Sequence, residues 1–102
     1  MKVIQELCDM IDDEINDAKR YITCALKKKD EYPHLADTFC RLSEEEMKHM
    51  GMLHTEVVSI IESYRKEKGE PPSDMMAVYD YLHQKSIDKA AEVKALQTMY
   101  KG

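Results

Sequence analysis

The chain has 102 residues, a formal net charge of −5, and a composition that is 43% hydrophobic with one Phe and no Trp. A chain of this length is expected to form one small domain, residues 1–102, with a modest core. The acidic balance argues against a nucleic-acid partner, and no run approaches the ~20 apolar residues of a membrane span. Cys8, Cys24 and Cys40 form no CxxC pair, which indicates reduced thiols in a cytoplasmic protein.

The composition favours helix, and no segment alternates as a strand would. A first helix is predicted over residues 2–29, because Pro33 disfavours helical backbone in the residue before it. Pro33 then suits the first turn of a second helix, over residues 33–68. A short connection between two long helices predicts an antiparallel hairpin.

A third helix is predicted over residues 74–100. Gly69 and the two prolines after it end the second helix, and Ser73 or Asp74 is expected to cap the third. The apolar face of this helix is loose and spreads sideways, which indicates contacts on two sides. The predicted fold is therefore all-α, a long antiparallel helical hairpin plus a third helix.

Each of the first two predicted helices carries a stripe of residues spaced by threes and fours, which is typical of an inward-facing surface. The stripes comprise Ile4, Leu7, Ile11, Glu14, Ala18, Tyr21 and Ala25, and then Leu35, Phe39, Leu42, Glu46, His49, Leu53 and Ile60. Glu14, Glu46 and His49 interrupt them. Ionised carboxylates in an apolar seam are costly unless a cation joins them.

These three residues are predicted to lie at one height in the hairpin. Counted from the turn near residue 31, Glu14 lies 17 positions before it, and Glu46 and His49 lie 15 and 18 positions after it. Glu46 and His49 are three apart and share one helix face. Two carboxylates and an imidazole offer oxygen-rich ligation, which suits iron or manganese better than structural zinc. We therefore predict that Glu14, Glu46 and His49 are metal ligands.

The Glu14 helix and the Glu46-Met47-Lys48-His49 motif resemble the ferritin-like superfamily, rubrerythrins included. Di-iron bundles of this superfamily use one Glu from each of two helices and Glu-x-x-His from each of two others. The resemblance covers the first two predicted helices, about two-thirds of the chain. It implies that Glu14 and Glu46 are oxygen ligands, one or both bridging, and that His49 is a terminal nitrogen ligand.

One chain supplies only half of such a site, so completion by a second copy is expected. Two copies place four carboxylates and two imidazoles around two divalent cations, as in a homodimer or a larger homo-oligomer. The half-length encapsulated ferritins are similar, with a di-iron site between subunits. That resemblance implies ferroxidase activity, with Fe(II) oxidised by O2 or peroxide.

Two other interpretations remain open at this stage. Equal residue counts on either side of the second predicted turn place Glu92 of the third helix level with His49, so Glu92 could complete the site within one chain. Asp80 and His83 have the spacing of the Glu-x-x-His motif, but the same count places them far from the level of the site. The three polar residues could instead form a metal-free layer that fixes the register of a helical dimerisation module. His54 is assigned to the surface or to an interface, because its spacing turns it away from His49.

Overall fold

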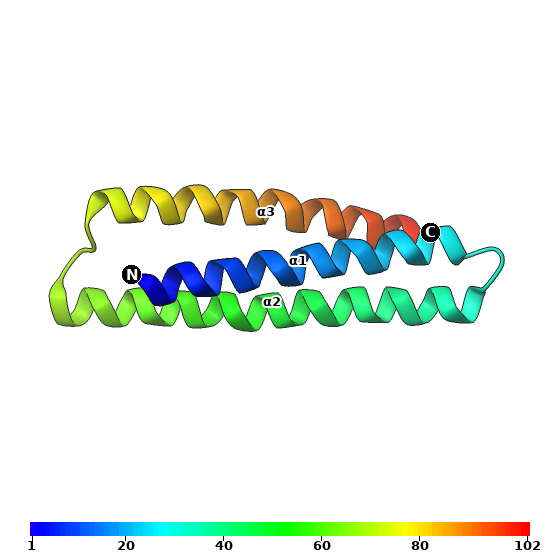
Figure 1. The fold of residues 1–102 in the computed structure, drawn as a ribbon, viewed down its shortest axis with the longest axis horizontal. Helices are drawn as coiled ribbons and strands as arrows, with labels where there is room; N and C mark the ends of the chain where they lie inside the picture. The colour runs from blue at the N-terminus through cyan, green and yellow to red at the C-terminus, as the bar shows by residue number, and fades with distance from the viewer.

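The computed structural model describes residues 1–102 as three helices without strands, which confirms the all-α prediction. They are α1 (Lys2–Lys28), α2 (Pro33–Lys68) and α3 (Ser73–Lys101). The helices lie side by side in a rod of 56 × 19 × 18 Å, and α3 returns along the α1–α2 hairpin in the direction of α1 (Figure 1). None of the three has a stretch apolar and long enough to cross a membrane.

The turns between the helices follow from proline and glycine. Pro33 opens α2, and Gly69 ends it with a φ of 84°, a left-handed conformation that glycine adopts without steric cost. The Gly69 backbone N–H donates to the Arg65 carbonyl oxygen at 3.0 Å. These contacts close α2 where the sequence predicts its end.

The predicted side-chain cap of the third helix is wrong. Pro72 occupies the N-cap position, and no side chain caps α3. The Pro72 carbonyl accepts from the Met76 N–H at 3.1 Å, so the helix begins at Ser73. Ser73 and Asp74 therefore already lie within the first turn, where neither side chain precedes the free backbone N–H groups that a cap would bind.

The core is thin, because only 14 of the 102 residues are buried. The predicted α1 stripe is partly correct, but Ile15 and Ile22 are buried in place of Glu14 and Tyr21. On α2 the stripe is displaced: the buried residues are Ala36, Cys40, Ser43, Val57 and Ile61. The predicted α2 stripe thus lies beside the core rather than in it, and it stays at least partly exposed to solvent.

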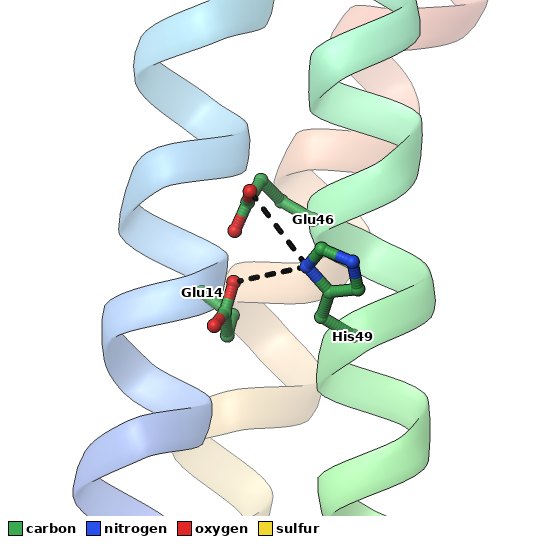
Figure 2. A group of neighbouring side chains, drawn as sticks. All are labelled: Glu14, Glu46 and His49. Carbon is green, nitrogen blue, oxygen red and sulfur yellow. Dashed lines mark ion pairs between the residues drawn. The ribbon is translucent and has the colours of Figure 1, made fainter.

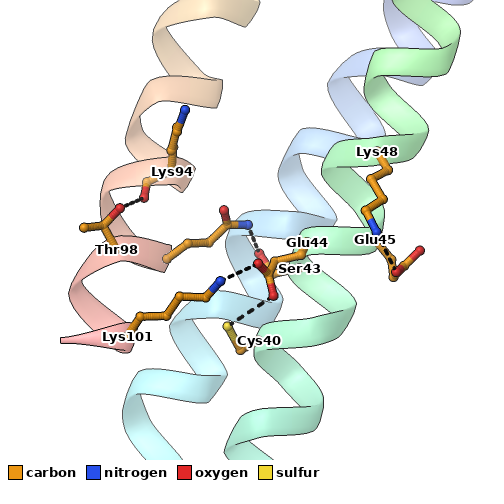
Figure 3. A network of polar contacts seen from close by, with 9 residues as sticks. Cys40, Ser43, Glu44, Glu45, Lys48, Lys94, Thr98 and Lys101 are labelled. Atoms are coloured by element: carbon orange, nitrogen blue, oxygen red, sulfur yellow. Dashed lines mark hydrogen bonds and ion pairs between the residues drawn. The ribbon is translucent and has the colours of Figure 1, made fainter.

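The third helix packs mainly on α1, and Val93 and Tyr100 are its buried residues. Polar contacts fasten its C-terminal half to α2 (Figure 3). Gln97 donates to the Ser43 hydroxyl at 3.0 Å, and Lys101 pairs with Glu44 at 2.7 Å. These contacts leave the opposite face of the α1–α2 hairpin free of α3.

Candidate metal centre

The free face of the hairpin carries the three residues singled out in the sequence. One donor atom from each of Glu14, Glu46 and His49 lies within 4.8 Å of the other two. The His49 Nδ1 atom is 3.7 Å from a Glu14 oxygen and 3.8 Å from a Glu46 oxygen. Figure 2 shows the three side chains converging between α1 and α2, with α3 passing behind them. The hairpin therefore brings the predicted residues together at one level.

The Glu14 and Glu46 carboxyl groups repel each other when both are ionised. Contact with the Glu14 carboxyl raises the pKa of Glu46, first through a shared hydrogen bond, and partial burial raises it further. A like charge close to a carboxylate disfavours ionisation, whereas the nearby His49 acts in the other direction. The pair therefore favours holding a proton or another positive species between its oxygens.

The donor set fits a first-row metal ion. Such ions bind oxygen and nitrogen at about 2.0–2.2 Å, so two donors on one ion lie about 3–3.6 Å apart. The distances of 3.7 and 3.8 Å are slightly wider than this and longer than a hydrogen bond. Small side-chain rotations would thus admit an ion, and the imidazole is not already saturated by the carboxylates.

The site opens to solvent in the isolated chain. The exposed fractions of the Glu14, Glu46 and His49 side chains are 27%, 19% and 50%. Prediction from the sequence placed these residues in an inward seam, but within one chain they border the core on an open face. The reason is that the buried column of α2 is shifted by one residue from the column that contains Glu46, and on α1 Ile15 is buried in place of Glu14.

Apolar side chains continue this open face on both sides of the polar site. Tyr21 of α1 stacks on Phe39 of α2, with ring centroids 6.2 Å apart. At the helical spacing of Glu14 and Glu46, the face also includes the exposed residues Val3, Met10, Leu35 and Leu42. Groups of large exposed apolar residues around a polar centre are typical of an interaction surface.

The other acidic residues near this level of the hairpin and on α3 lie outside the group. Glu92 forms an ion pair with Lys19 at 2.8 Å and is not part of the group. Glu45 pairs with Lys48 at 3.3 Å on the exposed side of α2. Asp80 is exposed as well. The α3 helix therefore contributes no carboxylate to the candidate site in this arrangement.

His54 and His83 form a contact that sequence reasoning missed. His54 is turned away from His49, as its spacing predicts, but it packs on α3 with its ring stacked on His83. Equal residue counts on either side of the turn between α2 and α3 place His83 level with residue 59 rather than with His54. The pairing of the two histidines depends on how α3 is rotated and shifted against α2, which the sequence does not specify.

Three long helices with a carboxylate–imidazole group between two of them define a ferritin-like helical protein. The chain belongs to the rubrerythrin family, a ferritin-like di-iron carboxylate family whose model matches residues 7–101. The match extends across all three helices. No curated protein and no solved structure matches the chain significantly.

Proposed function

We propose that this protein holds a pair of metal ions, iron by analogy with its family, between two copies of the chain and oxidises Fe(II) there. The observation that carries the proposal is the convergence of Glu14, Glu46 and His49 within 4.8 Å. Family membership supports iron as the metal. Manganese suits the same oxygen-rich ligands.

Charge and coordination support a dimeric site. One chain offers three donors, which leaves several positions of a hard or borderline cation unfilled. Two chains offer four carboxylates and two imidazoles, whose four negative charges match two divalent ions. The exposed apolar residues around the site would be covered in the same association, which supplies a hydrophobic driving force.

The three residues supply two kinds of ligand atom in this proposal. Glu14 and Glu46 supply carboxylate oxygens, and His49 supplies an imidazole nitrogen. Protons compete with the metal at Glu46 in particular, because contact with Glu14 raises the pKa of its carboxyl. When bound, iron supplies the exchange of electrons with O2 or peroxide. The three unpaired cysteines suit a reducing compartment such as the cytoplasm.

Metal content per chain tests the proposal. Wild-type protein, Glu46→Gln and the control Glu45→Gln would be loaded anaerobically with Fe(II), desalted and measured by elemental analysis. We expect about one metal per chain in the wild type and in the control, because Glu45 faces solvent beside Lys48. We expect loss of metal and of O2-dependent Fe(II) oxidation in Glu46→Gln. Equal metal content in the two variants would refute the assignment.

Sedimentation of surface variants tests the association. Leu42 is 38% exposed on the face that carries the site, whereas Met52 is 68% exposed and follows the solvent side of α2. Leu42→Lys should yield monomers with reduced metal content, and Met52→Lys should leave both properties unchanged. A wild-type monomer that binds metal fully would refute the intersubunit site.

A metal-free dimerisation module is the second candidate, and one observation favours it. The raised pKa of Glu46 means that a single proton could satisfy the carboxyl pair without a cation. A protein of this kind would contain no metal after loading and would remain dimeric in both glutamate variants. The elemental analysis therefore decides between the two functions.

A further inference from the structure

A second group of ionisable side chains lies on the other side of the hairpin, where α2 meets α3. The imidazole rings of His54 and His83 stack with centroids 4.9 Å apart and planes 15° apart. Tyr79, one turn before His83, stacks on the His83 ring at 5.5 Å. Apart from this stack and the C-terminal polar contacts, α2 and α3 touch little.

His54 carries an unsatisfied polar atom at this contact. Its Nε2 atom is buried and has no hydrogen-bond partner. Buried side-chain polar atoms are nearly always paired, so an orphaned one requires an explanation. Burial, with a further contribution from His83, lowers the pKa of His54. This shift favours the neutral imidazole, which is the form that binds metals.

A cavity of about 200 Å³ adjoins the two rings. Both histidines line it, and Cys8 of α1 lines it from the opposite helix. The remaining lining is mostly apolar, including Met50 and Ile87. The space is large enough for an ion together with a water molecule. Histidine and cysteine side chains from three helices thus border one partly open cavity that is lined by no carboxylate.

We propose that His54 and His83 form a second metal site, for a borderline transition-metal ion such as Zn²⁺, which would join α3 to the hairpin. Imidazole and thiol groups select such ions, whereas the acidic site on the opposite face suits harder ones. Cys8 lines the same cavity and is a candidate third donor, although the structure does not bring its sulfur within ligand distance of both histidines. This site is independent of the metal pair proposed for Glu14, Glu46 and His49.

The separation of the two rings supports a shared ion. Two imidazoles bound tetrahedrally at about 2.0–2.1 Å place their ring centroids about 5 Å apart. The observed separation is 4.9 Å, so the ring centres already stand at the required spacing. The rings are nearly parallel, and binding requires them to turn about χ2 until two nitrogens converge. That torsion is broad in histidine, so the rotation has a low rotamer cost.

Zinc titration of protein that lacks the acidic site tests this proposal. The parent would be the full chain carrying Glu14→Gln and Glu46→Gln, in which the carboxylate pair is removed. His83→Phe and His54→Phe, each added to the parent, keep an aromatic ring for stacking and remove the nitrogens. His34→Phe is the matched control, because His34 is exposed in the first turn of α2.

We expect the parent and the His34 control to bind one Zn²⁺ per chain in competition with a chromophoric chelator. Loss of either cavity histidine should weaken binding at least tenfold and abolish the zinc-dependent rise in melting temperature. Two variants are made so that one suffices if the other fails to fold. No zinc binding by the parent, or equal affinity in His83→Phe and His34→Phe, would overturn the proposal.

Cobalt spectra then define the donors. Co²⁺ bound to the parent should give visible d–d bands that disappear in His83→Phe. A thiolate charge-transfer band that is lost in Cys8→Ser would make Cys8 the third ligand, and bands without it would leave a two-histidine site completed by water. Cobalt bands that persist in both histidine variants would contradict the assignment.

Discussion

The Ser43 hydroxyl ties all three helices together, and its removal should weaken the fold by a predictable amount. Ser43 is fully buried, donates to the Ala18 carbonyl of α1 at 2.7 Å, and accepts from the Gln97 amide of α3 at 3.0 Å. Ala18 lies one turn after Glu14, and Ser43 lies one turn before Glu46. The contact therefore holds the register of α1 and α2 next to the candidate metal centre.

We expect Ser43→Ala to lower the free energy of unfolding by about 1.5 kcal/mol. The two hydrogen bonds contribute about 1 kcal/mol each, and alanine regains about 0.5 kcal/mol through its higher helix propensity. The Ala18 carbonyl keeps its helical partner, and the half-buried Gln97 amide can turn towards water, so neither group adds a large penalty.

The matched control is Ser59→Ala, which makes the same substitution at an exposed position of α2. It should raise the free energy of unfolding by about 0.5 kcal/mol through propensity alone, giving a difference of about 2 kcal/mol between the variants. Urea unfolding followed by circular dichroism, at one fixed protein concentration, measures this difference. A difference below about 0.5 kcal/mol would refute the reasoning.

Two further predictions concern protonation. Metal affinity should fall as the pH is lowered towards 4.5, because protons compete with the metal for Glu46, whose pKa is raised. In the absence of metal, the free energy of unfolding should decrease as the pH rises from 4.5 through that raised pKa, because the folded protein binds the Glu46 proton more tightly than the unfolded chain does. Calorimetric Mn²⁺ titrations and urea unfolding across this range measure both effects, and pH-independent affinity would exclude proton exchange at Glu46. The hydrogen bond to Asp37 raises the pKa of Tyr100 to about 12, so stability should be lost as the pH rises from 10 to about 12. Ultraviolet titration should show a late tyrosine step that is missing in Tyr100→Phe, and an unchanged titration would contradict the contact.

The fold class and the level of the site could be predicted because they depend on local features. Proline and glycine mark the helix ends, and a short connection fixes two helices antiparallel, so residues equidistant from the turn must face each other. This is why Glu14, Glu46 and His49 meet in the structure. Their identity as metal ligands stays a prediction.

The side of the hairpin on which the site opens could not be predicted. Apolar residues occupy two adjacent columns of α2, as in the pairs Phe39–Cys40 and Ile60–Ile61. Periodicity marks both columns as apolar and does not say which one faces the rest of the same chain. The sequence likewise does not specify how α3 is rotated about its axis. Counting residues from the turn before α3 predicts only the level of Glu92 along the bundle, and in the structure Glu92 pairs with Lys19 instead of approaching His49.

The contacts that hold α3 to the hairpin are unevenly distributed along its length, and this affects where the protein opens locally. Its polar contacts with Ser43, Asp37 and Glu44 gather near the C-terminus, whereas cavities of about 370 and 200 Å³ adjoin its first half. Local opening should therefore begin at Ser73 and progress towards Lys101, so that the N-terminal end of α3 detaches while its C-terminal end stays bound to α2. Such excursions would leave the carboxylates on the opposite face undisturbed, so the two sides of the hairpin can fluctuate separately.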